Sequence, residues 1–271
     1  MWYFFSFFLI VITTSININK DFTVLKEPVT GLEFVLIYKG SFYMGNPLDT
    51  NNIGGAVPHI VTISNNFWLS RTEVTLEQWQ KVMGKKEFHP EKPNPFSNEN
   101  LRYPAVCVSY FDVQDFLKRL EELSPGYKFR LPTESEWEYA CRAGTRTNFS
   151  FGNMLNDSLA NYNAYYPSEF SVLGQNVEHP NPVASYPPNQ WGLYDMHGNV
   201  WEWVSDYYAP YSGKNEVDPK GPQKGEGKVI RGGSWYFSAD KARSYHRGCH
   251  KPNLWGFSIG FRIVCEKNKI N

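Results

Sequence analysis

The stretch RLPTESEWEYACRAGT, residues 130–145, carries the clearest structural signals in the chain. Thr133 followed by Glu136 is a capping box, in which each side chain caps the backbone N–H of the other residue at the start of a helix. Trp137 and Cys141 are four residues apart, so both side chains lie on one face of that helix. The stretch therefore predicts a short helix that packs on a core through this face.

Two more capping boxes predict helices earlier in the chain. Thr75 pairs with Gln78, and the helix that follows should end at Gly84, since glycine readily adopts the backbone conformation that terminates helices. Ser109 pairs with Asp112, and apolar residues at helical spacing follow. All three predicted helices lie in the first 145 residues.

Strands are predicted before and between these helices. Residues 34–44 alternate in polarity and are rich in aromatic side chains, which is typical of a hairpin, here with its turn at 39–40. Residues 46–58 are rich in Asn, Asp and Gly and predict a loop, and strands are expected at 60–63 and 67–70. The second half of the chain is dominated by Asn, Pro and Gly, so we expect mostly loops there.

The composition limits the class of protein. Apolar residues make up 41% of the chain and aromatic residues 17%, alongside 21 Gly and 18 Pro, which favours a loop-rich fold with a core of aromatic rings. The 27 basic and 27 acidic residues cancel, so no electrostatic field favours nucleic acid or an anionic membrane as the partner.

The N-terminus predicts export. Residues 1–15 contain an apolar run followed by small polar residues, as in a signal peptide, although an uncleaved N-terminal anchor is the alternative. We expect a leader at 16–33, one domain at 34–266 and a short tail at 267–271. Nothing after the signal segment resembles a membrane span, so the predicted location is secreted or periplasmic.

Seven short motifs occur in order along the chain. They are FYMG (42–45), EVT (73–75), PAVCVSY (104–110), the stretch at 130–145, WGLYDMHGNVWEW (191–203), RGGSW (231–235) and GFR (260–262). Together these motifs resemble the formylglycine-generating enzymes, also called the sulfatase-modifying factor family, over residues 34–265. The resemblance implies an α+β fold, distantly like C-type lectin domains, with little regular secondary structure and with calcium ions that hold its loops.

The resemblance also implies two calcium sites, because carboxylate, amide and carbonyl oxygens are preferred calcium ligands. The first site would use Asn161 and the Tyr162 carbonyl, although Gln175 stands where the family has an acidic ligand. The second site would use the side chains of Asp195 and Asn199 with the backbone oxygens of His197 and Gly198.

The catalytic chemistry of the family is missing from the motifs. The family binds copper through two cysteines shortly after the GGS motif, and the matching positions here are Phe237 and Ala242, so we do not expect copper. Ser234 is not in a G-x-S-x-G nucleophile motif. Glu134 and Glu138 are four residues apart on the third predicted helix, where we expect a solvated or capping role.

Four cysteines, which allow three pairings, offer other chemistry. Cys249 lies between His246 and His250, and this trio could hold copper or zinc as an altered metal site. Cys141 and Cys265 are expected to form a structural disulfide, and Cys107 to be a buried free thiol.

The sequence therefore predicts a calcium-stabilised binding or structural module that lacks formylglycine-generating activity. Its partner would be a peptide, a protein or a glycan. The alternative is an oxidoreductase of the same family with an altered metal site.

Overall fold

The structure, a computed structural model, describes residues 22–48, 55–84, 96 and 100–267. The predicted signal peptide and residues 268–271 of the predicted tail lie outside the described residues. Among the described residues, no helix is both long and apolar enough to cross a membrane. The fold is α+β with short helices and strands, as the sequence predicts.

The largest sheet has five strands in the order β1-β2-β5-β12-β6, and all its neighbours are antiparallel. Its strands are β1 (Val24–Lys26), β2 (Glu33–Ile37), β5 (Phe67–Ser70), β12 (Val264–Lys267) and β6 (Tyr127–Arg130). Strand β1 falls within the segment expected to be a leader, so part of that segment is built into the sheet. The last strand, β12, lies between β5 and β6 and so joins β6 to the rest of the sheet.

A three-stranded sheet continues from the first. It contains β3 (Gly40–Met44), β4 (His59–Ile63) and β8 (Glu216–Val217) in the order β3-β4-β8. The predicted hairpin within 34–44 is wrong, because β2 and β3 belong to different sheets and pair with β5 and β4 instead. The two registers, Ile37 opposite Phe67 and Gly40 opposite Ile63, make one long antiparallel ribbon that bends between the sheets. The described ends of the loop predicted at 46–58, residues 46–48 and 55–58, contain no strand, and residues 49–54 lie outside the described residues.

The three predicted helices are all present with their capping boxes. They are α1 (Leu76–Met83), α2 (Tyr110–Leu123) and α3 (Glu134–Arg142). Thr75, Ser109 and Thr133 each accept a hydrogen bond from the backbone N–H three residues later, which satisfies a donor that the helix leaves unpaired. Gly84 caps the end of α1, as expected.

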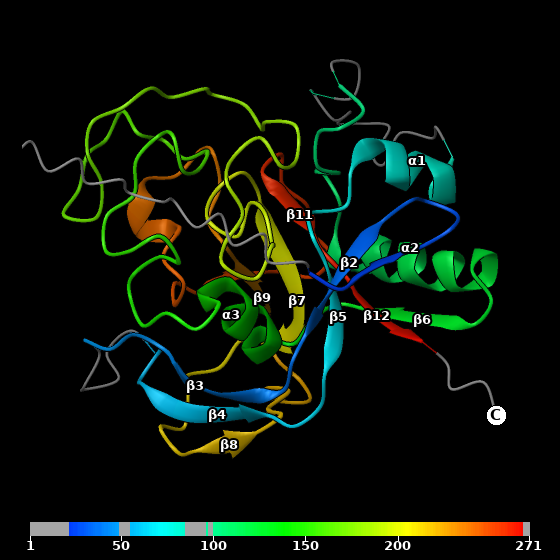
Figure 1. Cartoon of the computed structure of the whole chain (residues 1–271), viewed down its shortest axis with the longest axis horizontal. Helices are drawn as coiled ribbons and strands as arrows, with labels where there is room; N and C mark the ends of the chain where they lie inside the picture. The colour runs from blue at the N-terminus through cyan, green and yellow to red at the C-terminus, as the bar shows by residue number, and fades with distance from the viewer. Residues whose placement is uncertain (1–21, 49–54, 85–95, 97–99, 268–271) are drawn as a thin grey trace, which may run out of the picture.

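A four-stranded sheet lies at the centre, with the order β10-β9-β7-β11. Its strands are β10 (Gly248–His250), β9 (Lys228–Arg231), β7 (Trp201–Tyr207) and β11 (Ile259–Phe261). Figure 1 shows α1 and α2 beside the five-stranded sheet, and α3 between β7 and the sheet of β3 and β4. The loops of the second half form the remaining part of the molecule, and the short 3-10 helix η1 (Ala239–Lys241) lies among them.

The core divides into two main clusters on the two sides of this arrangement. One holds the aromatic side chains under α1 and α2, including Trp79, Phe116 and Trp203. The other surrounds α3 and includes Trp137 and Cys141, so the predicted inward face of α3 is confirmed. Helix α3 is buried on almost every side, and its polar residues are buried with it.

Candidate functional site

The two positions that match the family's copper-binding cysteines flank helix η1. Gly232 and Gly233, which precede them, both have positive φ angles, of 96° and 75°. A Cβ on Gly233 would lie 2.9 Å from the Cα of Ala242, so only glycine allows this close approach. The RGGSW motif therefore brings positions 237 and 242 near the same turn, but neither side chain is a thiol.

Phe237 belongs to a group of contacting rings, of which Tyr236, Phe237 and Phe257 are partly exposed and Trp235 is buried. Its ring centroid lies 5.9 Å from that of Trp201 and 5.4 Å from that of Tyr236. Tyr236 in turn lies 5.4 Å from Phe257, and Trp235 contacts both. Exposed fractions of 52% for Tyr236, 37% for Phe237 and 41% for Phe257 leave much of this surface open to solvent. We call Trp235, Tyr236, Phe237 and Phe257 the aromatic surface.

Ala242 is buried, in a different core cluster from Trp235, and is tied to His197. The Ala242 carbonyl accepts a hydrogen bond from Nδ1 of His197 at 2.8 Å, while Nε2 accepts one from the Ser150 backbone N–H at 3.0 Å, which assigns the proton to Nδ1. Burial lowers the pKa of His197 to about 4, so the ring is neutral at pH 7. His197 therefore has a structural role in holding this turn.

Cys141 lies against the same histidine, with its Sγ 3.7 Å from Nε2. Burial raises the pKa of this thiol to about 12. Such a thiol is a poor nucleophile at pH 7, and it is a single sulfur where the family uses a pair. The Cys141–His197 contact is therefore no substitute for the missing thiolates.

The structure does not bring the His246, Cys249 and His250 trio together as a metal site. Alternation along β10 turns Cys249 to the opposite face from His250, and Cys249 is exposed. The His246 ring contacts Trp201 at 5.9 Å and the His250 ring contacts Trp203 at 5.6 Å. No group of three or more His, Cys, Asp or Glu side chains within the described ranges could hold a metal ion.

The expected disulfide between Cys141 and Cys265 is also absent. Both are buried free thiols, and they lie in different core clusters. Cys107 is a buried free thiol, as expected, but its φ of 62° places it in a turn rather than in a strand. The fold is thus held by packing and polar networks.

The residues expected to bind calcium do come together. Asp195, Gly198 and Asn199 have φ angles of 58°, 86° and 58°, so this segment is a tight left-handed turn. A Cβ on Gly198 would lie 2.2 Å from the carbonyl oxygen of Asn161, and the Asn199 backbone N–H donates to that same oxygen at 2.7 Å. The two sites expected from the sequence are therefore adjacent. Tyr162 is buried, whereas Gln175 is exposed.

Glu73 is a member of this cluster that the sequence analysis missed. Its side chain is fully buried, and Oε1 accepts a hydrogen bond from Nδ2 of Asn199 at 3.0 Å. Oε2 of Glu73 and Oδ1 of Asn161 are buried without a hydrogen-bond partner among the described residues. The position of Glu73 in the EVT motif, two residues before the capping residue Thr75 of α1, is the signal that could have identified it.

Burial dominates the electrostatics of these carboxyl groups. It raises the pKa of Glu73 well above its ordinary value, and the neighbouring charges of Asp195 and Glu202 add to the effect. It raises the pKa of Asp195 to about 6, although Oδ2 of Asp195 accepts a hydrogen bond from the Ala184 backbone N–H at 2.7 Å. A shared proton or a bound cation would relieve this repulsion.

Comparison with known proteins agrees with this geometry. Residues 21–267 match the sulfatase-modifying factor enzyme 1-like domain. The chain is 32% identical to the formylglycine-generating enzyme of Bos taurus over 198 residues, which cover 69% of this chain and 50% of that protein, so the match spans about half of the relative's length. It is 31% identical over 203 residues, 70% of this chain and 58% of the relative, to a Mus musculus protein described as inactive C-alpha-formylglycine-generating enzyme 2.

Among solved structures, PvdO from Pseudomonas aeruginosa superposes with a TM-score of 0.74 at 32% identity, covering 90% of this chain and 98% of PvdO. The sequence motifs, the fold and the domain match agree over nearly the whole chain. The chain therefore belongs to the sulfatase-modifying factor family of formylglycine-generating enzymes.

Proposed function

We propose that this chain does not generate formylglycine and acts as a non-catalytic binding module. The observation that carries the proposal is the pair Phe237 and Ala242, one a half-exposed ring and the other a buried methyl group. Neither can hold the cuprous ion that the family's thiolates hold. Among the described residues no group of three or more His, Cys, Asp or Glu side chains replaces the copper-binding pair, so the alternative of an altered oxidoreductase gains no support.

The test is incubation of the full chain with a sulfatase-type peptide, cuprous ion and oxygen, followed by mass spectrometry of the peptide. We expect the peptide cysteine to remain unmodified, while an active formylglycine-generating enzyme treated in parallel converts it. Conversion by this chain would overturn the proposal.

The aromatic surface is the binding site of this module, and we propose a peptide with apolar side chains as its ligand. Tyr236 stands nearly perpendicular to three neighbouring rings, at 87° to Trp235, 81° to Phe237 and 84° to Phe257. Rings in this arrangement present both apolar faces and polarised edges to a ligand, which suits contact with apolar and aromatic side chains. Exposed aromatic residues are also enriched where proteins bind other chains.

Selection from a displayed peptide library tests the peptide ligand. We expect enriched peptides to lose at least tenfold in affinity on Tyr236→Ala, because truncation of a central aromatic contact commonly costs more than about 1.4 kcal/mol. Tyr38→Ala, at an exposed tyrosine that makes no contact with this surface, is the matched control. Peptides that bind both variants equally would place the site elsewhere.

We further propose that calcium stabilises the loops through the turn at Asp195. The donor set fits a hard cation, because it combines two carboxylates with amide and backbone oxygens. The support is the pair of buried oxygens without a hydrogen-bond partner among the described residues, Glu73 Oε2 and Asn161 Oδ1. A cation there would offset the excess negative charge of the cluster.

Export completes the proposal. The apolar N-terminal segment supports a secreted or periplasmic protein. Mass spectrometry of the mature N-terminus tests this, with cleavage after the apolar run as the expected result. An intact Met1 in protein from the soluble cytoplasmic fraction would contradict it.

A further inference from the structure

A groove on another part of the molecule shares no residue with the aromatic surface. Its volume is about 840 Å³, within the range of ligand-binding pockets. Strand β7 connects the two regions, since Trp201 at its start contacts Phe237 and Ser205 further along lines the groove. The other walls come from the β4–β5 turn, the start of α2, the segment before α3, the end of β12 and the residues after β8.

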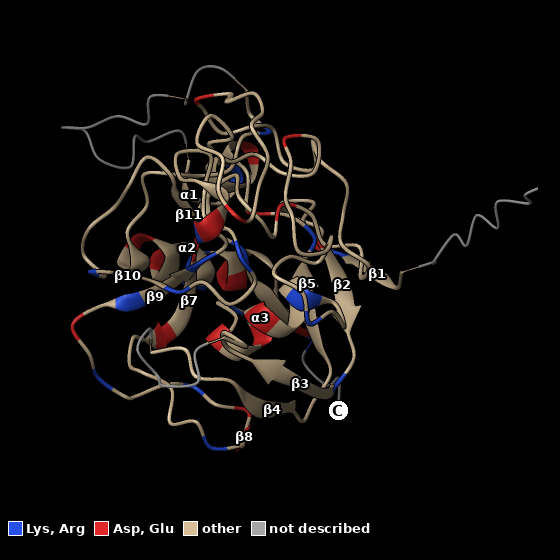
Figure 2. Cartoon of the chain, turned by 90° about the vertical axis from the view of Figure 1, so that its left-hand side faces the viewer, with Lys and Arg blue, Asp and Glu red and all other residues tan. Residues whose placement is uncertain are grey.

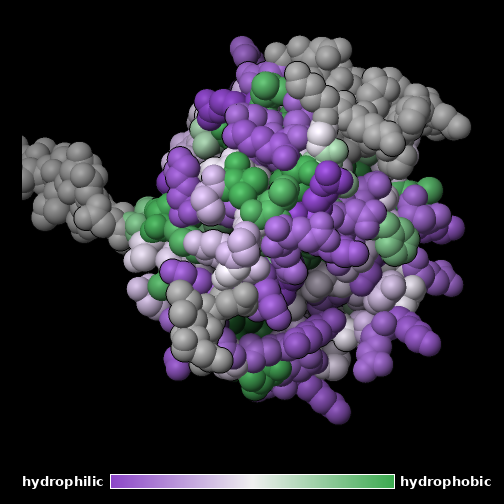
Figure 3. All heavy atoms as spheres, turned by 90° about the vertical axis from the view of Figure 1, so that its right-hand side faces the viewer, coloured by the Kyte–Doolittle hydropathy of each residue, from purple (hydrophilic) through white to green (hydrophobic). Residues whose placement is uncertain are grey.

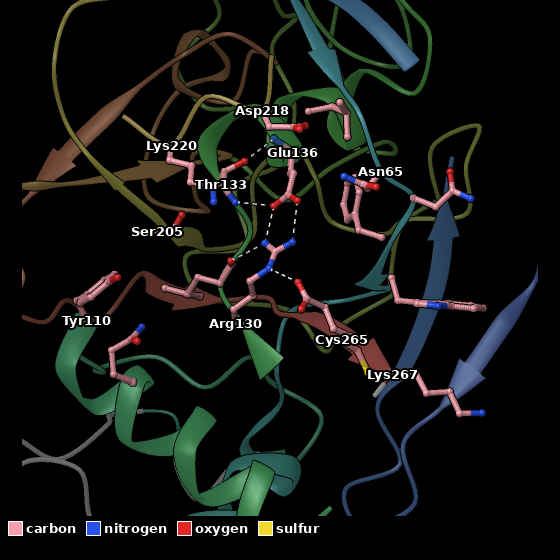
Figure 4. Close-up of a pocket in the computed structure, with 17 residues that line it drawn as sticks. Asn65, Tyr110, Arg130, Thr133, Glu136, Ser205, Asp218, Lys220, Cys265 and Lys267 are labelled. Atoms are coloured by element: carbon pink, nitrogen blue, oxygen red, sulfur yellow. Dashed lines mark hydrogen bonds and ion pairs between the residues drawn. The ribbon is translucent and has the colours of Figure 1, made fainter. Parts of the chain in front are cut away.

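The centre of the groove holds ion pairs of Arg130, and the charged side chains of the whole lining sum to zero. Figure 4 shows Arg130 facing Glu136, and its guanidinium forms two parallel bonds to that carboxylate at 2.7 and 2.8 Å. The Nε atom of Arg130 donates to Glu266 at 2.7 Å. The rest of the lining adds Asp218, Lys220 and Lys267, so three acids face three bases. The lining as a whole therefore carries no net formal charge, which favours a neutral ligand over a strongly charged one.

Amides and aromatic rings provide the remaining contacts. Asn65 and Asn66 line one side and exposed Gln114 the other, and each primary amide offers both donors and an acceptor. Trp68 and Tyr110 are half-buried, and each packs one part of its ring on the core below. Figure 3 shows that the face carrying α2, β6 and β12 is mostly hydrophilic, with hydrophobic side chains gathered in patches.

The strands whose own residues line the groove offer no free backbone edge to a peptide. Strands β4, β5 and β12 each have a partner on both sides. Strand β6 is at the edge of its sheet, but the N–H of Phe129 donates to Glu121 of α2 at 2.8 Å, and α2 packs along this strand. Recognition of an extended peptide by strand addition needs a free edge. Recognition in the groove must therefore come from side chains.

We propose that this groove binds a neutral oligosaccharide. A sugar ring has an apolar face of C–H groups that packs on Trp68 or Tyr110, and hydroxyl groups that pair with amides and carboxylates. The lack of net charge, the exposed Gln114 amide, the remaining hydrogen-bonding groups of Asn65 and Asn66, and the closed strand edges all fit such a ligand better than a peptide or an ion.

Saturation-transfer NMR of the full chain with neutral oligosaccharides of glucose, mannose, galactose and N-acetylglucosamine tests this. We expect at least one to bind, and its dissociation constant to rise at least tenfold on Trp68→Ala, which removes the ring on which the sugar packs. Gln114→Ala, at an exposed position on α2, should raise it about threefold without affecting the fold.

Two variants separate this site from other surfaces. Tyr38→Ala and Tyr236→Ala should leave sugar binding unchanged, because neither residue lines the groove. If Trp68→Ala fails to fold, Trp68→Phe and Gln114→Ala decide the question. Failure of every sugar to bind, binding insensitive to both groove positions, or a peptide that competes for the groove would each overturn the proposal, and none of these results bears on the aromatic surface.

Discussion

Two buried clusters of charge in this protein are built in opposite ways. Around α3, two carboxylates face three guanidinium groups, and the bonds are distributed among them. The carboxylate of Glu138 accepts from Arg142 at 2.9 Å and from Arg231 at 2.5 Å, and that of Glu134 accepts from Arg247 at 2.6 and 2.8 Å. Figure 2 shows these acidic residues of α3 at the centre of the molecule with basic segments beside them.

The cluster at the Asp195 turn has more acidic than basic groups, the opposite of the α3 cluster. Glu73, Asp195 and Glu202 are buried, and Arg262 is the cation that acts on all three. Both carboxylate oxygens of Glu202 already bond that guanidinium, at 2.6 and 2.7 Å. Glu73 and Asp195 are thus left without a strong cationic partner. The α3 cluster is complete within the protein, whereas the turn cluster requires a proton or a cation.

The largest loss of stability should come from removing a charge from the α3 cluster. Arg231→Met should lower the free energy of unfolding by about 3–5 kcal/mol, because it removes the guanidinium that donates to Glu138 Oε2 and to the Ser244 carbonyl and so leaves both buried acceptors without this donor. Lys81→Met is the control, since Lys81 forms an exposed ion pair with Glu77 that is worth about 0.5 kcal/mol. Urea unfolding of both variants measures the difference. A loss below about 1 kcal/mol for Arg231→Met would show that the α3 cluster contributes little.

Calcium should stabilise the protein through the cluster at the Asp195 turn and not through the α3 cluster. Binding to the folded state alone raises stability by about 2.7 kcal/mol at a hundred times the dissociation constant, so the melting temperature should fall in chelator. Asp195→Asn should remove most of this difference, because it removes a carboxylate but keeps an acceptor for Ala184. Asp206→Asn, at a buried carboxylate near α3, should leave it intact. Identical melting curves with calcium and with chelator would eliminate the calcium sites.

The contrast also shows how far the sequence could predict the structure. The three helix starts are correct because a capping box is a local signal that spans three residues. The hairpin within 34–44 is wrong because alternation identifies a strand but not its partner, which lies beyond the following loop.

Burial of charge is what the sequence could not predict. Glu134 and Glu138 were expected in solvent or at a cap, yet both are buried, because their partners Arg231 and Arg247 lie 93 and 113 residues further along the chain. Spacing on a single helix cannot reveal such partners. The Asp195 turn, in contrast, could be predicted because its glycine and oxygen donors are contiguous, whereas Glu73, 126 residues from Asn199, could not.

Asp206 is a buried carboxyl group beside the α3 cluster, next to the start of the helix. Its carboxylate accepts a hydrogen bond from the Glu134 backbone N–H at 2.8 Å, but burial, together with the charge of Glu134, raises its pKa to about 7. Between about pH 4 and 7 the folded protein holds a proton that the unfolded chain releases, so stability falls as pH rises through this window. Asp206→Asn keeps the acceptor and removes the charge.

We therefore expect Asp206→Asn to be more stable than the wild type at pH 8 by at least about 1.4 kcal/mol, the equivalent of one pKa unit, and nearly equal to it at pH 4. Denaturant unfolding at the two pH values measures this. A variant that is less stable than the wild type at pH 8 would mean that Asp206 acts as a charged cap of α3.

The smallest expected change in stability comes from replacing a glutamate by glutamine, and its sign should differ between the two clusters. Glu73→Gln keeps an acceptor for Asn199 and removes negative charge from a cluster that has too much, so in chelator at pH 7 it should raise stability, by at most about 1 kcal/mol. The gain should grow as pH rises, because the raised pKa of Glu73 means that its ionisation costs more in the folded state. Glu138→Gln, the same change in the α3 cluster, should instead lower stability at pH 7, since it leaves Arg142 and Arg231 without their shared counter-charge. Calcium should reverse the result for Glu73→Gln, because this change removes a ligand of the proposed site and the wild type would then be the more stable protein.

Denaturant unfolding of both variants with calcium and with chelator gives the four values needed. A loss of stability for Glu73→Gln in chelator would show that the Glu73 carboxylate is compensated within the protein.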